Sequence, residues 1–124
     1  MMEQQSVGLF KEEDTIQSTY IQWMNQQLKT QHKTWQEIKA SLQDAVSVIQ
    51  ALENAAGVRC SPKYSCNPRF SIQRVENWMV ACTFMKNIGV DVNGFKPDEL
   101  ASGSDSAICN MFRSILKWQQ LSVK

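Results

Sequence analysis

Hydrophobic residues recur every three or four positions along much of the chain, which is the spacing of one face of an α-helix. The first such stripe, which Asp14 is placed to cap, consists of Ile16, Tyr20, Trp23, Met24 and Leu28. A second stripe extends from Trp35 to Leu52, and Gly57 follows it in the position of a residue that ends a helix. We expect a break within this second stripe near Ser41–Asp44.

The segment Val58–Phe70 has a different character, because its prolines, asparagine and serines are typical of loops. Helical spacing resumes after it, with Ser71 as the expected N-cap and Gly89 as the expected stop. The apolar positions of this helix are Ile72, Val75, Trp78, Met79, Cys82 and Met85. The sequence therefore predicts a long helix that is buried along this stripe.

Two further helices are predicted in the last third of the chain. Pro97 suits the first turn of a short helix, Pro97–Ala101. The final helix, with Ser104 or Asp105 as its cap, has apolar positions at Ile108, Met111, Phe112 and Ile115, flanked by Leu116 and Trp118. No stretch alternates apolar and polar residues as a half-buried strand does. The predicted fold class is all-α, with four main helices and one or two short helices around a single core.

Composition and charge narrow the class of protein. The 124 residues are the size of one domain, for which we expect a tail at 1–12 with an isolated Leu9-Phe10 pair, a folded part at 13–121 and an end at 122–124. A net charge of +1 argues against a general nucleic-acid binder. No apolar run approaches the roughly 18–20 residues of a membrane span, and Met1–Val7 does not resemble a secretory signal. These features predict a soluble, cytoplasmic domain.

The charge is distributed unevenly along the chain. The first 57 residues carry 4 basic and 7 acidic groups, and the remainder carries 9 basic and 5 acidic groups. Four cations precede the next acidic residue, Glu76; we call the segment that holds them the basic loop, and they are Arg59, Lys63, Arg69 and Arg74. We interpret this loop, with Lys33 near it, as a contact to an acidic partner. The alternative is a solvated loop whose cations pair with Glu37, Asp44 or Glu53.

Little in the sequence points to catalysis or to a metal site. The four cysteines are Cys60, Cys66, Cys82 and Cys109. They lack the close Cys-x2-Cys pairs that zinc usually requires, and the last two fall on apolar helix positions, as small hydrophobic residues do. His32, the only histidine, lies in a polar connector. There is no Gly-rich phosphate loop and no Gly-x-Ser-x-Gly sequence. We expect no enzymatic activity, no metal and no cofactor.

Five segments, taken in order and with their spacings, resemble the calponin homology family. The first carries an aromatic residue followed by Trp, Asn and Leu at the family's spacing. The segments are Tyr20–Leu28, Glu37–Ala45, Val75–Asn77, Gly89–Val92 and Asp98–Gly103. The resemblance extends from about Ile16 to Gln119. The chain departs from the family pattern at Ser41 and Ala45, where Asp and Gly are usual, and at Ser102 and Ser104 around Gly103.

Within the family, the last helix is most similar to that of the single domain at the start of neuron navigator proteins. The positions that carry this similarity are Ala107-Ile108, Met111-Phe112 and Ser114. The resemblance implies a compact calponin homology-type bundle without catalytic activity. It also implies a module that binds the cytoskeleton, since paired domains of this family bind actin filaments.

The resemblance implies actin filaments as the leading partner. The alternative is a single domain that acts as a protein-interaction scaffold or associates with microtubules. The exposed faces of the first and last helices contribute to the filament contact in actin-binding members, and here the corresponding positions are Gln22, Gln26, Lys29, Arg113, Ser114 and Lys117. Each of these residues is equally compatible with an ordinary solvated helix face.

Overall fold

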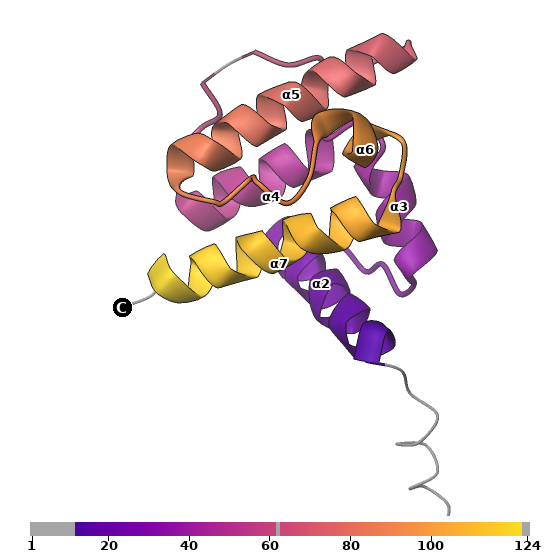
Figure 1. Ribbon diagram of the computed structural model, residues 1–124, viewed down its shortest axis with the longest axis vertical. Helices are drawn as coiled ribbons and strands as arrows, with labels where there is room; N and C mark the ends of the chain where they lie inside the picture. Colours follow the sequence, from indigo (N-terminus) through magenta and orange to yellow (C-terminus); the bar gives the residue numbers. More distant parts are fainter. Residues whose placement is uncertain (1–11, 62, 123–124) are drawn as a thin grey trace, which may run out of the picture.

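The computed structural model describes residues 12–61 and 63–122, which form six helices and no strand. The helices are α2 (Glu12–Leu28), α3 (Trp35–Leu42), α4 (Val46–Ala56), α5 (Ser71–Ile88), α6 (Pro97–Ala101) and α7 (Asp105–Ser122). The predicted all-α class is confirmed, with α3 and α6 as the short helices (Figure 1). The Leu9-Phe10 pair and residues 123–124 lie outside the described residues.

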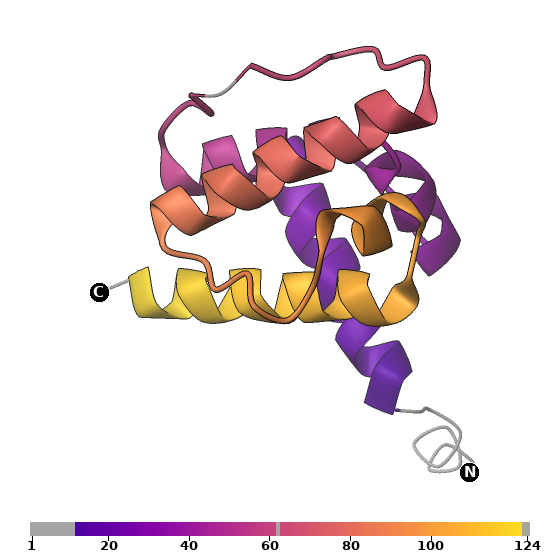
Figure 2. The same cartoon turned by 45° about the horizontal axis from the view of Figure 1, so that its top comes forward.

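The helix α4 lies at the centre of the bundle, where it packs against α2 on one side and α5 on the other. In Figure 1, α4, α5 and α7 run in similar directions, whereas α2 crosses them steeply. Figure 2 shows α6 between α5 and α7, and it contacts both of them. The loop from α4 to α5 passes over the outside of the bundle, so its residues are available to solvent on at least one side.

The core contains a cluster of aromatic rings at the crossing of α2 and α7. Tyr20 stacks on Phe112 with ring centroids 4.9 Å apart, and Trp23 approaches the same ring edge-on at 6.3 Å. Trp78 is fully buried on α5, and its indole N–H donates to the carbonyl of Gln43 at 3.3 Å. Each such side chain stabilises the fold by about 1.5–3 kcal/mol through burial alone.

The chain breaks and helix stops lie where the sequence places them. Ala45, in the left-handed conformation with φ 68°, separates α3 from α4 inside the second apolar stripe. The carboxylate of Asp44 accepts from the N–H of Val46 at 3.1 Å and supports this turn. Gly57 and Gly89 end α4 and α5 with φ 73° and φ 106°, values that a residue without a Cβ adopts at little cost.

Two of the expected helix caps are wrong. Asp14 lies inside α2, which begins at Glu12. Phe70 rather than Ser71 is the N-cap of α5, because the side chain of Gln73 accepts from the backbone N–H groups of Arg69 and Phe70. This is the half of a capping box in which the side chain of the third helical residue accepts from the backbone N–H of the N-cap.

The predicted burial of Ile72 and Met79 is wrong, since these side chains are 63% and 54% exposed. The buried face of α5 is centred on Ala81. Nine residues separate Ile72 from Ala81, which is two and a half helical turns and therefore the opposite side of the helix. Trp78 and Met85, from the same predicted stripe, are buried as expected.

The helix α7 is fastened near both ends. At its start, Asp105 forms an ion pair with Lys39 at 2.7 Å and accepts from the indole N–H of Trp35 at 3.2 Å. These two donors, Lys39 above all, hold the pKa of Asp105 below its usual value. Towards its end, the indole N–H of Trp118 donates to the carbonyl of Ile88 at 2.9 Å, so Trp118 packs back on the domain.

Candidate functional site

A groove between α2 and α7 is the first candidate binding surface. It consists of two adjoining hollows of about 400 and 350 Å³, which share Ile16 and Arg113 in their linings. Ile16, Tyr20 and Leu116 give the groove an apolar part, and Arg113 and Lys117 from α7 give it positive charge. A groove of this kind suits a partner that combines apolar and acidic side chains.

The two cations of this groove are exposed and carry no ion pair among the described residues. The Arg113 guanidinium donates to the side-chain oxygen of Asn110 at 3.1 Å. Burial raises the pKa of Tyr20, and the nearby positive charge of Arg113 opposes that rise. Arg113 therefore lies beside the aromatic cluster of the core and is also open to solvent.

The six predicted filament-binding residues do not form one cluster. Arg113 and Lys117 line the groove. Gln22 and Gln26 are exposed on α2 but do not line it, and Ser114 is half-buried on another flank of α7. Lys29, the sixth residue, is exposed at the far end of α2.

The basic loop is the second candidate surface, and it is fastened to the domain at three points. Near its start, the backbone N–H of Cys60 donates to the carboxylate of Glu53 at 2.8 Å. In the middle, Ser65 exchanges hydrogen bonds with the side-chain amide of Asn77 at 2.9 and 2.7 Å. At its end, Gln73 accepts from Arg69 and Phe70 as described above. The loop is thus held in place despite its length.

Asn77 is the central residue of this arrangement. It is 2% exposed, and its amide also donates to the carbonyl of Asp44 at 3.0 Å. One buried side chain therefore joins α5, the middle of the basic loop and the turn between α3 and α4. A buried amide whose donors and acceptor are all occupied contributes to stability and fixes the positions of its partners.

The cations of the basic loop are unpaired among the described residues. Arg59, Lys63 and Arg69 are exposed, whereas Arg74 lies in α5 rather than in the loop, contrary to the prediction, and is half-buried. The one ion pair in the described part of the chain joins Lys39 and Asp105. The carboxylates considered as partners for these cations accept backbone hydrogen bonds instead. They are Glu37, Asp44 and Glu53.

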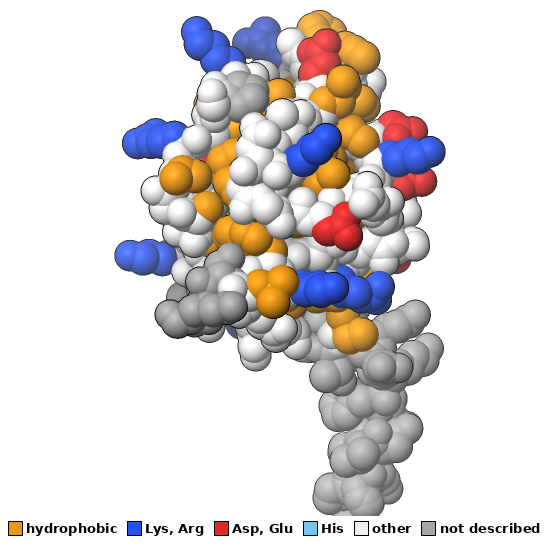
Figure 3. Space-filling view, turned by 60° about the vertical axis from the view of Figure 1, so that its left-hand side comes forward, with side chains coloured by type: hydrophobic (Ala, Val, Ile, Leu, Met, Phe, Trp, Pro, Cys, Tyr) orange, Lys and Arg blue, Asp and Glu red, His pale blue; other side chains and the backbone are white. Residues whose placement is uncertain are grey.

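Figure 3 shows how the charges are spread over one face of the molecule, where Lys and Arg side chains stand apart from one another. Such spacing leaves each cation accessible to an acidic partner. It also means that no single dense cluster of positive charge dominates this face.

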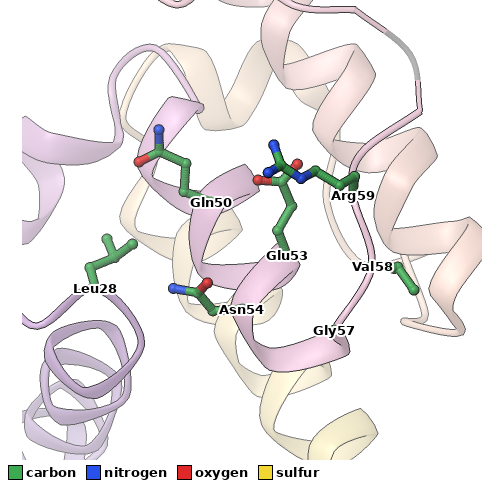
Figure 4. A pocket seen from close by; sticks show the side chains of 7 residues that line it. All are labelled: Leu28, Gln50, Glu53, Asn54, Gly57, Val58 and Arg59. Carbon is green, nitrogen blue, oxygen red and sulfur yellow. The ribbon is translucent and has the colours of Figure 1, made fainter.

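A hollow of about 460 Å³ connects the end of α2 to the start of the basic loop. Figure 4 shows Leu28 from α2 across from α4, and Arg59 extending over Glu53. A second hollow of about 400 Å³ continues along the loop past Lys63 and Tyr64. Because Lys29 directly follows Leu28, the far end of α2 and the first cation of the loop lie on one side of the domain.

Two of the four cysteines, Cys60 and Cys82, have raised pKa values. Burial raises the pKa of Cys82 to about 11, and burial together with the negative charge of Glu53 raises the pKa of Cys60. A raised pKa keeps a thiol protonated and weakly nucleophilic. Within residues 12–61 and 63–122, no group of three or more His, Cys, Asp or Glu side chains is arranged to hold a metal ion.

Sequence reasoning missed the residues that position these surfaces. Asn25 binds the connector between α2 and α3, donating to the carbonyl of His32 at 2.8 Å and accepting from its N–H at 3.1 Å. Asn77 does the same for the basic loop. Both asparagines adjoin buried residues of an apolar stripe, Met24 and Trp78, and a polar residue at the edge of such a stripe was the available signal.

The family model for the calponin homology (CH) domain matches residues 14–120. The chain therefore belongs to the calponin homology family, and the resemblance expected from the five segments is confirmed. Domains of this family are non-catalytic binding modules, so the property to be explained is binding. In the part of the chain that the structure describes, no helix has both the length and the hydrophobicity required to cross a membrane.

Several known proteins are similar to this chain. Filamin-A of Drosophila melanogaster is 32% identical over 76 residues, which cover 61% of this chain and 3% of that protein. Human Neuron navigator 3 is 29% identical over 103 residues, or 82% of this chain and 4% of that protein. Cortexillin-2 of Dictyostelium discoideum is 24% identical over 120 residues, or 94% and 27% respectively. The chain thus corresponds to a small part of each relative, and the expected similarity to navigators is confirmed.

Proposed function

We propose that this domain binds cytoskeletal filaments, with actin as the leading polymer, and links the protein that carries it to them. Membership of the calponin homology family and similarity to filamin, cortexillin and navigator proteins support a role at the cytoskeleton. Filaments are acidic, so a binding domain needs accessible cations. The compartment in this proposal is the cytoplasm.

The groove between α2 and α7 carries the proposal. Arg113 and Lys117 are exposed and have no ion pair among the described residues, and they lie beside an apolar part made by Ile16, Tyr20 and Leu116. Apolar contact supplies affinity, whereas unpaired cations supply attraction and orientation. In the proposed contact, Gln22, Gln26, Lys29 and Ser114 extend the surface around the groove.

Co-sedimentation with actin filaments, and separately with microtubules, tests the proposal at low and physiological salt. We expect the wild-type domain to pellet with actin and to pellet less as salt rises, because the attraction between exposed charges is screened. The double variant Arg113→Glu/Lys117→Glu should lower the affinity at low salt by about tenfold or more.

A matched control separates local contact from net charge. The variant Lys86→Glu/Lys96→Glu changes the net charge by the same amount at two exposed residues that do not line the groove. It should lower the affinity much less. Equal losses for the two double variants, or absence of pelleting by a folded wild-type domain, would contradict the proposed groove contact.

The basic loop supports a second candidate function, a scaffold or microtubule-associated module without actin binding. The backbone of this loop is fastened by Glu53, Asn77 and Gln73, and its cations are unpaired among the described residues. Charge reversal of Arg59 and Arg69, the exposed arginines of this loop, tests it. If the wild-type domain pellets with microtubules but not with actin, and this charge reversal abolishes the pelleting, the second function is favoured over the first.

A further inference from the structure

The outer face of α5 exposes large apolar side chains that the fold does not use. Ile72 and Met79 are 63% and 54% exposed, and Phe70, directly before the helix, is 65% exposed. Ile72 and Met79 are seven residues apart and therefore share one side of the helix, about 10 Å from each other along its axis. Hydrophobic side chains gather at the top of the face in Figure 3, the level at which α5 lies in Figure 1.

This stripe lies between charged residues of a definite pattern. Arg69 directly precedes Phe70, Glu76 lies one turn after Ile72 on the same side, and Lys86 follows near the end of the helix. The order along the face is thus positive, apolar with one carboxylate, and positive. From Val58 to Gly89 the chain carries five cations and one acidic residue, so the surroundings of the stripe are positive overall.

We propose that the outer face of α5 binds an acidic amphipathic helix of a partner protein. The apolar residues of that helix, spaced i, i+3 or i+4, and i+7, pack on Ile72 and Met79. Its carboxylates lie towards its two ends, opposite Arg69 and Lys86, and its middle carries no acidic residue because Glu76 faces it. From Phe70 to Lys86 the face is about 24 Å long, which matches a helix of four to five turns.

The geometry favours a helix over a membrane surface. The apolar side chains follow the axis of α5 over two turns, as ridges for helix packing do. A helix that lies on a membrane presents a broad apolar face bordered by lysines and arginines, whereas this side of α5 offers two large exposed apolar side chains, Ile72 and Met79. Here the carboxylate of Glu76 lies on the same side as the stripe, where it would meet the negative surface of an anionic bilayer.

Two synthetic peptides of about five helical turns provide the probe. Both carry the same stripe of leucines; one has glutamates at both ends and the other has lysines. We expect the glutamate peptide to shift the backbone amide signals of residues 70–86 in NMR spectra of the domain. The lysine peptide should bind with an affinity that is lower by at least about tenfold. Equal binding of both peptides, or signals that shift on the groove between α2 and α7, would overturn the proposal.

The variant Ile72→Ser/Met79→Ser should weaken the glutamate peptide by about tenfold or more and should fold normally, since both side chains are exposed. Val58→Ser removes another exposed apolar side chain, outside α5, and should leave binding unchanged. Unchanged binding by the double variant would overturn the proposal. Failure of the glutamate peptide to bind the wild-type domain would also overturn it. If phosphatidylserine vesicles then bind the wild-type domain and not the double variant, the outer face of α5 contacts a membrane instead.

Filament co-sedimentation separates this inference from the proposed function. Ile72 and Met79 line neither hollow of the groove between α2 and α7, so the double variant should pellet with filaments as the wild-type domain does. If it loses pelleting and the glutamate peptide does not bind, the outer face of α5 belongs to the filament contact and the peptide proposal is wrong.

Discussion

Lys29 ends α2 in the left-handed conformation with φ 57°, although it carries a Cβ. This conformation costs a residue other than glycine about 1–2 kcal/mol, and the side chain is exposed, so its replacement removes no core packing. Lys29→Gly should therefore stabilise the domain by about 0.5–1 kcal/mol, after the greater freedom of glycine in the unfolded chain is subtracted. Urea unfolding at equilibrium measures the difference.

The same physics supplies an opposite control at the end of α4. Gly57 has φ 73°, and a Cβ added there would meet no atom within 4 Å. Gly57→Ala should destabilise the domain by about 1 kcal/mol through backbone strain alone. If both substitutions change the free energy of unfolding in the same direction, the backbone conformations of these two positions do not determine the effect.

Asp105 gives the stability of the domain a dependence on pH. Its pKa is lowered in the folded state by Lys39 and Trp35, so its contribution is present above the unfolded pKa and is lost as the pH falls through the folded value. The carboxylate is 62% exposed, so Asp105→Asn should cost only about 0.5–1 kcal/mol at pH 7. Unfolding at pH 7 and pH 3 should show this difference at the higher pH and little at the lower, whereas an equal difference at both would exclude the ion pair as its cause.

At the scale of whole elements, Asn77 joins α5 to two segments that are distant in sequence. Asn77→Ala removes hydrogen bonds to both backbone groups of Ser65 and to the carbonyl of Asp44. We expect a loss of about 2–4 kcal/mol, because buried backbone groups then lack partners, and faster hydrogen exchange at the amide of Ser65.

Asn87→Ala is the matched control for this substitution, since Asn87 is exposed on the same helix. It should change neither the free energy of unfolding by more than about 0.5 kcal/mol nor the exchange of Ser65. Equal exchange at Ser65 in the two variants would mean that Asn77 does not hold the basic loop.

The positions of the helices can be predicted from the hydrophobic spacing of the sequence, but the side that each helix buries cannot always be predicted from it. In α5 the six predicted apolar positions span about 140° of the helix circumference. Val80, Ala81 and Phe84 place apolar side chains around the remainder, so the spacing fits more than one buried side. Contact with α4 and α6 decides that Trp78 is buried and Ile72 is not. Helix stops were more predictable, because Gly57 and Gly89 act through their own backbone conformation.

The candidate surfaces show the same division between local and distant causes. The exposure of Arg113 and Lys117 follows from the stripe of α7, which the sequence defines. The anchoring of the basic loop depends on hydrogen bonds from Ser65 to Asn77 and from Asn77 to Asp44, across 12 and 33 positions. Sequence spacing alone carries no information about such pairs, and the structure is needed to show that the loop is held.

At the scale of the molecule, the cations of the two candidate surfaces share no hollow. Arg113 and Lys117 lie at the groove between α2 and α7, and Arg59 lies at the hollows along the basic loop. The helix α2 reaches both regions, with Ile16 in the groove and Leu28 in the hollow beside Arg59. A filament that contacts the whole length of α2 would meet both groups, whereas a smaller partner would meet one.

Additivity of charge reversals distinguishes these two cases. Groups that share no partner and lie apart contribute independently to a binding free energy. If one filament contacts both, the combined variant Arg59→Glu/Arg69→Glu/Arg113→Glu/Lys117→Glu should lose the sum of the binding free energies that the two double variants lose separately, as co-sedimentation at low salt would measure. If the filament uses the groove alone, the combined variant should lose the same binding free energy as Arg113→Glu/Lys117→Glu. The effect of the additional change in net charge is first subtracted, as measured with the control variant Lys86→Glu/Lys96→Glu. We expect the sum, because the cations of both groups are unpaired in the described part of the chain and α2 connects the two regions.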